Sequence, residues 1–140
     1  MSEIERVTAI RELVPLLFVQ DINHSSAFYR DHLGFEITTT WAPNGQLTWC
    51  RLERSGSAIM LQQADAEDGP ADNRGRGVHF YFNCNDIDAL YAEFGTRGLQ
   101  LNPPTVAFYG MKQVYLNDPD GYELCFQSPV LVDGQAFGPK

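Results

Sequence analysis

The chain has 140 residues, is 44% hydrophobic and 12% aromatic, and carries a formal net charge of −8. Its length and apolar content fit one folded domain, or two small modules that share a core. The acidic balance disfavours nucleic acids and anionic membranes as partners, because both bind basic surfaces. Three cysteines without a CxxC pair, no membrane-spanning apolar run and no secretion signal lead us to expect a reduced, cytoplasmic protein.

The first half of the chain predicts a β-α-β-β-β module at residues 13–63, behind an N-terminal extension of residues 1–12. Its helix, at residues 25–33, has apolar residues three and four positions apart, with Asn23 or Ser25 as its cap. Four runs rich in β-forming residues are the predicted strands: residues 14–19, 35–41, 46–54 and 57–63.

A second module of the same kind is predicted at residues 78–128, after a polar connector at residues 64–77 that contains Gly and Pro. The sequence leaves open whether this connector closes over a site as a lid. A C-terminal tail follows at residues 129–140. The predicted elements of the second module are strands at residues 78–84, 111–116 and 122–128, a helix at 87–96 and an extended stretch at 99–106.

The two modules repeat one another with a period of 65 residues. Asp21-Ile22 recurs as Asp86-Ile87 after an apolar run, and Gly56 recurs as Gly121 before the closing strand. These matches hold one register across a strand, a helix and a strand, which is the pattern of a duplicated unit. A duplicated unit builds a pseudo-symmetric site, so equivalent residues of the two modules are expected to converge there.

The alternation of side chains along the strands separates two faces of the predicted sheet. One face is uniformly apolar, so we expect it to pack under the two helices; it comprises Leu17, Val19, Ile59, Leu61, Phe80, Phe82, Leu124 and Phe126. The other, here called the mixed face, combines aromatic, polar and ionisable groups: Val14, Leu16, Phe18, Ala58, Met60, Gln62, His79, Tyr81, Asn83, Glu123, Cys125 and Gln127. Such a face suits the lining of a ligand cavity, or else a half-exposed surface or a dimer contact.

Three motifs resemble the vicinal oxygen chelate superfamily, which holds glyoxalases, extradiol dioxygenases, and fosfomycin and bleomycin resistance proteins. They are the AFYRDHLGF run at residues 27–35, the stretch from His79 to Asp88, and Asp118-Pro119-Asp120-Gly121-Tyr122. The resemblance covers residues 13–128. It implies an α+β fold in which two βαβββ modules form a curved mixed sheet around a concave cavity, with the helices on the outer face. It also implies a homodimer, whose modules pair within or between chains.

The same resemblance implies where a metal would bind, because metal-using members take four ligands from His, Gln and Glu on four strands. Carried over one at a time, these positions fall on Val14, Met60, His79 and Cys125. The repeat supports this set, since Val14 and His79 are 65 residues apart, as are Met60 and Cys125. Only His79 is a usual ligand, and Glu123 is the nearest second donor. We therefore expect no metal or other cofactor, with a divalent ion at His79 and Glu123 as the alternative.

The metal-free, bleomycin-resistance-like branch resembles this sequence most. We therefore predict a protein that sequesters an aromatic or cationic small molecule in the sheet concavity or a dimer groove, since rings stack on flat heterocycles and acidic groups meet cationic tails. The predicted ligand-binding residues are Phe18, Trp41, Trp49, Met60, His79, Tyr81, Tyr109, Tyr115, Glu123 and Cys125. The alternatives are a glyoxalase-type lyase, isomerase or dioxygenase that uses His79 and Glu123 as ligands or acid–base groups, and a dimer module without a ligand.

Overall fold

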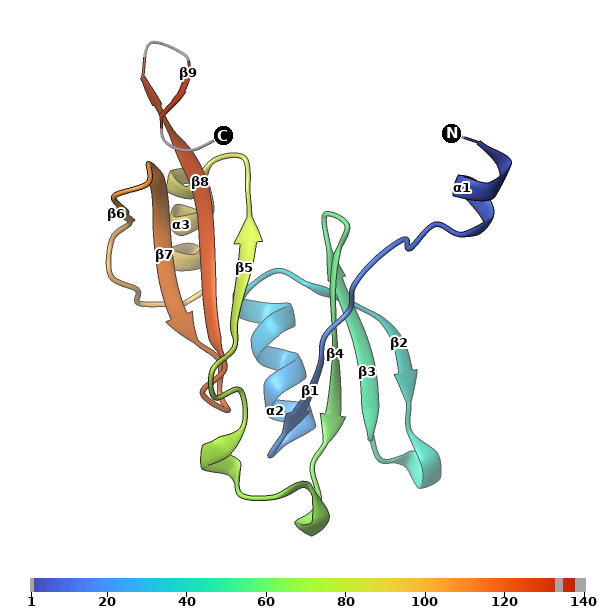
Figure 1. Ribbon diagram of the computed structural model, residues 1–140. Coiled ribbons are helices and arrows are strands. Elements are labelled where there is room, and N and C mark those ends of the chain that lie inside the picture. The colour runs from blue at the N-terminus through green and yellow to red at the C-terminus, as the bar shows by residue number, and fades with distance from the viewer. Residues whose placement is uncertain (1, 133–134, 138–140) are drawn as a thin grey trace.

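A computed structural model describes residues 2–132 and 135–137 of the chain (Figure 1). It confirms the predicted α+β fold of two βαβββ modules. The first sheet has the strand order β1-β4-β3-β2, with β1 Leu16–Val19, β2 Glu36–Trp41, β3 Trp49–Arg54 and β4 Ser57–Gln63. The second has the order β5-β8-β7-β6, with β5 His79–Asn83, β6 Thr105–Val106, β7 Met111–Asn117 and β8 Glu123–Val132, and a short β9, Gln135–Phe137, pairs with β8. Residues 133–134 and 138–140 of the predicted tail lie outside the described residues.

The strand pairing repeats together with the sequence. In both modules the first strand runs parallel to the last, β1 beside β4 and β5 beside β8. Leu17 pairs with Leu61, and the residues 65 positions later, Phe82 and Phe126, pair in the same way. The repeat is therefore a repeat of strand register as well as of residue type. In the described residues β1 and β5 do not pair with one another, so each is an edge of its own sheet.

The helix of each module begins directly after an aspartate that caps it. Asp21 precedes α2 (Ile22–Ala27) and Asp86 precedes α3 (Ile87–Thr96), and each carboxylate accepts a hydrogen bond from a backbone N–H of the first turn. The Asp-Ile pair recurs because each of its residues has a structural role in both modules. The aspartate caps the helix, and the isoleucine that follows is buried, since Ile22 and Ile87 are both 1% exposed. No helix within residues 2–132 is long and apolar enough to cross a membrane.

The prediction that Asn23 or Ser25 caps the first helix is wrong, because both residues lie inside α2. A carboxylate placed just before the first turn satisfies a free N–H and suits the positive end of the helix dipole. Beyond its last residue α2 continues as a π-helical turn, Phe28–His32, and Gly34 follows with φ of 75°. Glycine suits this positive φ, and a Cβ at this position would lie 2.5 Å from Nη1 of Arg54, so the Arg54 side chain would have to shift.

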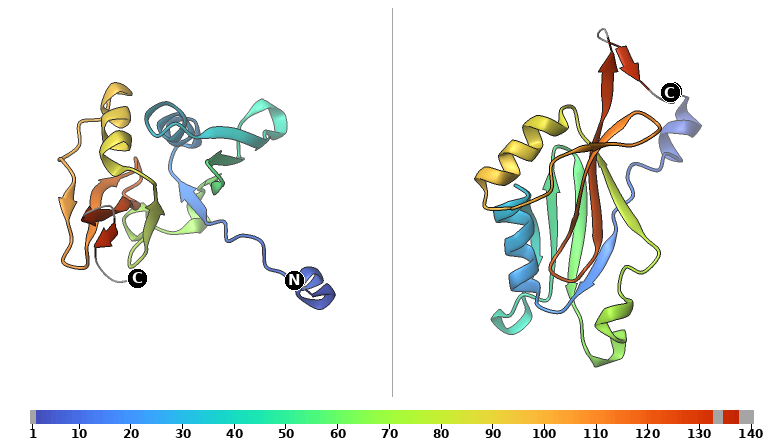
Figure 2. Two further views of the ribbon diagram at one scale, coloured as in Figure 1. Left: turned by 90° about the horizontal axis from the view of Figure 1, so that it is seen from above. Right: turned by 90° about the vertical axis from the view of Figure 1, so that its left-hand side faces the viewer.

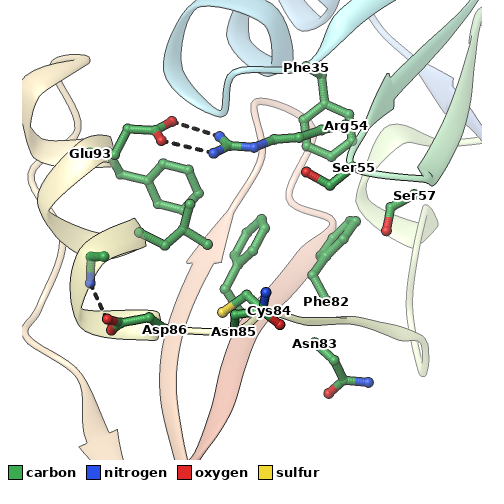
Figure 3. A pocket seen from close by; sticks show the side chains of 14 residues that line it. Phe35, Arg54, Ser55, Ser57, Phe82, Asn83, Cys84, Asn85, Asp86 and Glu93 are labelled. Carbon is green, nitrogen blue, oxygen red and sulfur yellow. Dashed lines mark hydrogen bonds and ion pairs between the residues drawn. The ribbon is translucent and has the colours of Figure 1, made fainter.

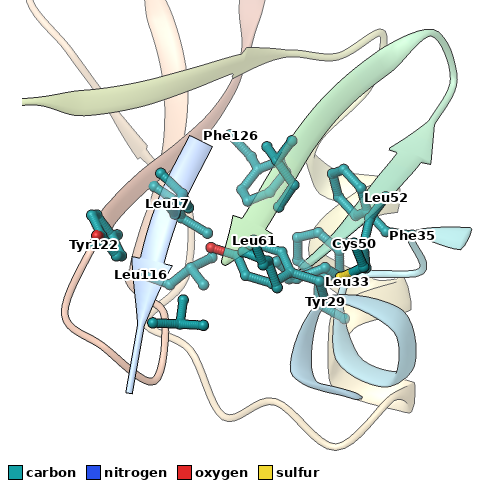
Figure 4. Packing of buried hydrophobic residues seen from close by; sticks show 14 of the residues in the cluster. Leu17, Tyr29, Leu33, Phe35, Cys50, Leu52, Leu61, Leu116, Tyr122 and Phe126 are labelled. Carbon is teal, nitrogen blue, oxygen red and sulfur yellow. The ribbon is translucent and has the colours of Figure 1, made fainter. Parts of the chain in front are cut away.

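Both helices lie on the same side of the two sheets, as the view from above shows (Figure 2). The apolar faces of the sheets contribute to one core that the two modules share (Figure 4). The predicted apolar face is confirmed in this core: Leu17, Val19, Ile59, Leu61, Leu124 and Phe126 are buried, and Phe80 and Phe82 pack against them partly buried. Each such side chain removed from water contributes about 1.5–3 kcal/mol, so this face holds the modules together.

The turn between β7 and β8 closes one end of the junction between the modules. Asp118 accepts a 2.7 Å hydrogen bond from the Tyr29 hydroxyl, and the Tyr122 hydroxyl donates one of 2.7 Å to the backbone oxygen of Phe18. Burial raises the pKa of Asp118, although the hydrogen bonds that it accepts oppose the shift. The Asp-Pro-Asp-Gly-Tyr motif of the second module is thus hydrogen-bonded to the first module through the side chains of Asp118 and Tyr122.

The segments that precede the two modules take different courses. The N-terminal residues, which include the short helix α1 (Glu3–Val7), extend away from the rest of the molecule (Figures 1 and 2), and Ile10 is 94% exposed. The connector instead stays close to the modules, with two short 3-10 turns at Ala66–Asp68 and Ala71–Asn73. Its Arg74 is almost fully buried, with Nη1 lying 3.8 Å from Asp120.

Candidate ligand-binding site

The mixed face of the second module carries a close histidine–carboxylate contact where two of its strands begin. His79 opens β5 and Glu123 opens β8, and the two residues are partners in the parallel register. His79 Nε2 lies 2.5 Å from Glu123 Oε2, and both side chains are 49% exposed. The structure therefore brings the two predicted acid–base candidates together at a surface that a ligand can reach.

Two tyrosines form an aromatic pair on the same face. Tyr81 on β5 and Tyr115 on β7 flank Cys125 on β8, which pairs with both in register. The two hydroxyls are 3.0 Å apart, and the rings meet edge to face with centroids 6.4 Å apart. Both residues are nearly half exposed, at 45% and 48%. The hydrogen bond with Tyr81, and then burial, raise the pKa of Tyr115, so its phenol stays protonated at neutral pH.

Cys125 lies beneath this tyrosine pair. It is 0% exposed, although its position on β8 puts it on the mixed face. Burial raises the pKa of the Cys125 thiol more than its hydrogen bond with Tyr115 lowers it. A covered, protonated thiol is a poor nucleophile and a poor metal ligand.

Amide side chains extend the tyrosine pair into a hydrogen-bond network. Gln113 on β7 accepts a hydrogen bond of 3.3 Å from Tyr115, and its Nε2 donates to the Tyr109 hydroxyl at 2.6 Å and to Gln127 at 2.9 Å. Gln127 in turn donates to Asn83 at 2.9 Å. Each amide is held by its neighbours, so the network fixes the direction in which its polar groups point.

Gln113 is the residue of this network that the sequence analysis misses. Alternation along β7 puts Gln113 on the same face as Tyr115, which lies two residues further on, and that signal was available in the sequence. Gln113 is nevertheless only 4% exposed, and its partners come from β8 and from the loop before β7. Its position at the centre of the network follows from the order of the strands.

The mixed face of the first module carries a pair of tryptophans. Trp41 on β2 pairs in register with Trp49 on β3, which pairs with Gln62 on β4. Together with two threonines these residues line a groove of about 460 Å³, and Trp41 is 58% exposed. Phe18 and Met60 lie on the same face and are partly buried.

The ten predicted ligand-binding residues therefore form two groups. The second module holds His79, Tyr81, Tyr109, Tyr115, Glu123 and Cys125, and the first holds Phe18, Trp41, Trp49 and Met60. The sheets that carry the two groups are not hydrogen-bonded to each other in the described residues, and both use their opposite faces for the shared core. The structure thus brings the members of each group together on its own sheet.

The donor atoms on the mixed faces do not fit a divalent metal ion. Of the four positions that the resemblance implies, Val14 has no donor atom, Met60 offers a thioether and Cys125 is a covered thiol. His79 and Glu123 supply two donors, and residues 2–132 contain no group of three or more His, Cys, Asp or Glu placed to hold a metal. A catalytic zinc site typically has three protein ligands, so this pair falls short.

Fold and site together define a class of protein built from two βαβββ modules in matching register, each with one buried apolar face and one mixed face. The model of the Glyoxalase/Bleomycin resistance protein/Dioxygenase superfamily matches residues 7–126. The chain belongs to this superfamily, which confirms the resemblance drawn from its motifs. A search of curated proteins found no match.

Solved structures of both binding proteins and enzymes share this fold. TnmS3, an antibiotic binding protein from Streptomyces sp. CB03234, has a TM-score of 0.67 and 21% identity over 87% of this chain and 98% of its own. A bleomycin-binding protein complexed with bleomycin has a TM-score of 0.68 and 20% identity, over 85% and 98%. A lactoylglutathione lyase from Agrobacterium tumefaciens has a TM-score of 0.61 and 22% identity, over 84% and 92%. At these identities the likeness shows the fold alone.

Proposed function

We propose that the chain is a metal-independent binding protein of the bleomycin-resistance type, which sequesters an aromatic or cationic small molecule against its mixed faces. The observation that carries this proposal is the exposed, edge-to-face pair of Tyr81 and Tyr115. Hydrogen bonds from Tyr81 through Tyr115 to Gln113 hold the rings before a ligand arrives. A flat ligand that stacks on such a platform costs little additional side-chain entropy.

Negative charge beside the platform favours a cationic group on the ligand. The Glu123 carboxylate is half exposed, and the chain as a whole carries a net charge of −8. A ligand ammonium or guanidinium group can replace His79 as the hydrogen-bond partner of the Glu123 carboxylate. The ring faces of Tyr81 and Tyr115 attract cations as well. The overall charge adds long-range attraction, which raises the association rate of a cationic ligand.

A second copy of the chain completes the site in this proposal. In the described residues Leu16, Trp41, Tyr81 and Tyr115 are all more than 40% exposed on the mixed faces. Exposed apolar side chains grouped in this way mark a binding surface or an interface. A homodimer that sets the first-module face of one copy against the second-module face of the other would enclose an aromatic ligand on two sides.

The second candidate function is a glyoxalase-type lyase, isomerase or dioxygenase. The contact of His79 with Glu123 favours it, because an imidazole beside a carboxylate is an acid–base pair. In this candidate the pair would move a proton of the substrate. The shared fold of the lactoylglutathione lyase supports the comparison at the level of architecture.

Isothermal titration calorimetry with bleomycin tests the binding proposal. We expect saturable heat that Tyr81→Ala reduces and that Tyr91→Phe, a change on the partly buried face of α3, leaves unchanged. Elemental analysis after dialysis against Ni, Zn, Mn and Fe is the second arm. Stoichiometric metal that His79→Ala removes would overturn metal independence, and absence of heat at high micromolar bleomycin would exclude that class of ligand.

A further inference from the structure

A cavity of about 410 Å³ lies at the end of the module junction opposite the Asp118–Tyr122 turn (Figure 3). The hairpin turn between β3 and β4 borders it on one side, and the end of β5 with the start of α3 borders it on the other. Its lining includes Phe35, Phe82 and Phe126, which belong to the buried face of the sheets. Of the mixed-face residues only Asn83 also lines the cavity, which is otherwise separate from the faces where we place the first ligand.

The repeat relates this cavity to the closed end of the junction. Tyr122 fills the closed end: it is 5% exposed, and its hydroxyl donates to the backbone oxygen of Phe18 at 2.7 Å. In the repeat, Tyr122 is equivalent to Ser57, 65 positions earlier, and Phe18 is equivalent to Asn83, 65 positions later. Both Ser57 and Asn83 line the cavity. The short side chain of Ser57 leaves open the volume that a phenol ring occupies at the other end.

The hydrogen-bond acceptor that Tyr122 uses also has an equivalent here. Along an edge strand, the backbone N–H and C=O groups of one residue face the neighbouring strand, and those of the next residue face the free edge. The Cys84 N–H donates to Gln127 on β8 at 2.8 Å, so the backbone oxygen of the preceding Asn83 faces the free edge of β5. Phe18 has the equivalent position on β1. The next residue, Val19, accepts a hydrogen bond from Ala64 on the side of β4, so the backbone oxygen of Phe18 also faces the free edge of its strand. The cavity thus keeps an acceptor for a hydroxyl group.

The walls of the cavity suit a flat ring. Phe35 and Phe82 meet edge to face with centroids 6.0 Å apart, and Phe82 stacks on Phe126 at 4.7 Å. The guanidinium of Arg54, which also lines the cavity, is held in place by two hydrogen bonds to Glu93, of 2.7 and 2.8 Å (Figure 3). Aromatic rings pack favourably against other rings and against an immobilised guanidinium.

We propose that this cavity is a second ligand site, which takes a planar aromatic ring bearing a hydroxyl group, that is, a phenol. The ring occupies the volume that Tyr122 fills at the opposite end, between the phenylalanines and the Arg54–Glu93 pair. Its hydroxyl donates to the backbone oxygen of Asn83. The site is independent of the binding function proposed for the mixed faces.

Titration with 4-methylphenol, the side chain of tyrosine as a free molecule, tests the proposal in the wild-type chain. We expect saturable binding with a Kd of about 1 mM or tighter. Amide NMR signals should shift at residues 54–57 and 83–86, and toluene, which lacks the hydroxyl, should bind more weakly. Saturable shifts confined to the mixed faces, or equal affinity for toluene, would overturn the assignment.

The matched variant is Ser57→Tyr, which supplies here the ring that Tyr122 supplies at the other end. It should weaken 4-methylphenol binding at least roughly tenfold. Ser57→Ala keeps the cavity open and should bind as the wild type does. Tyr81→Ala should leave 4-methylphenol binding unchanged, so failure of this site and failure of the mixed-face site are distinguishable. Undiminished binding in a folded Ser57→Tyr variant would contradict the site, and the NMR localisation decides the question if that variant does not fold.

Discussion

Tyr29 and Asp118 lie 89 residues apart in the chain and are joined by a 2.7 Å hydrogen bond inside the shared core. Tyr29 is 0% exposed and Asp118 is 5% exposed. The bond ties the helical segment of the first module to the closing turn of the second. Asp118 also accepts hydrogen bonds from the backbone N–H groups of Asp120 and Tyr122, so a single buried carboxylate organises this end of the junction.

Replacing Tyr29 by Phe should lower the free energy of unfolding by about 1–3 kcal/mol, because a buried carboxylate loses a hydroxyl donor. Urea denaturation measures this loss. Tyr91→Phe is the matched control: that hydroxyl donates to the backbone oxygen of Leu101 at 3.2 Å in a partly buried position. We expect a smaller loss there, of about 0.5–1.5 kcal/mol. Equal losses in the two variants would contradict a special role for Asp118.

The acid limb of the stability profile should depend on Glu93. Its hydrogen bond from Arg54 lowers the pKa of the carboxyl from 4.5 to about 2, with Arg97 contributing and burial opposing. Because the folded-state pKa is depressed, the stabilisation is complete above about pH 4.5 and is lost as the pH falls toward 2. Glu93→Gln should flatten this limb by about 1 kcal/mol, allowing for screening of a side chain that is 35% exposed.

Urea unfolding at several pH values between neutral and strongly acid checks the Glu93 prediction. Asp88→Asn is the control, since Asp88 pairs with Lys112 at 2.9 Å but its side chain is 63% exposed. Exposed pairs of this kind contribute little, so the Asp88 variant should keep the acid limb of the wild type. The idea fails if Glu93→Gln loses stability on acidification as steeply as the wild type does.

The ring of Tyr81, more than its hydroxyl, should carry ligand affinity. Tyr81→Ala removes half of the aromatic platform and should weaken bleomycin binding roughly tenfold. Tyr81→Phe keeps the ring and loses only the contact with the Tyr115 hydroxyl, so we expect it to weaken binding less than about threefold. Calorimetric Kd values for the two variants decide the matter. A Phe variant as weak as the Ala variant would assign the affinity to the hydrogen-bond network instead.

Charge at Glu123 should set the salt dependence of binding to a cationic ligand. Glu123→Gln should lower the affinity and make it less sensitive to ionic strength, because a half-exposed carboxylate is screened by salt. Asp88→Asn is the control, because it removes the same charge from α3, where Asp88 pairs with Lys112 at 2.9 Å. Kd values measured at low and high salt separate the local effect of the Glu123 carboxylate from the effect of net charge. Identical changes in both variants would mean that only the net charge matters.

Alternation and the repeat were sufficient to predict which side chains of β1, β4, β5 and β8 face the core. Leu17 and Leu61 are equivalent in the repeat to Phe82 and Phe126. The alternation predicted all four on the apolar face, where the structure has them. This works because the core face of a strand is fixed by side-chain period, which is local information. The same rule placed Cys125 on the mixed face, and whether a residue there is covered depends on the size of its neighbours on the adjoining strands.

The parts of the site that could not be predicted depend on which strands are neighbours. Gln113 joins Tyr109 and Gln127 only because β7 lies beside β8, an order that the sequence does not state. The cavity at the junction is a further case. Ser57 and Tyr122 are equivalent in the repeat and differ in size, and the consequence for the volume between the modules becomes visible only when both ends are packed.

The recurring aspartates should be equivalent in energy as well as in position. Asp21→Ala and Asp86→Ala should each lower the free energy of unfolding by about 1 kcal/mol, because each leaves a first-turn N–H without its acceptor. Serine also caps helices, so Asp86→Ser should recover most of the loss, while Asp88→Ala, inside the first turn of α3, should cost less than the loss of the cap. Urea denaturation of the four variants makes the comparison. If Asp86→Ser is no more stable than Asp86→Ala, the contribution comes from negative charge at the helix start and not from the capping hydrogen bond.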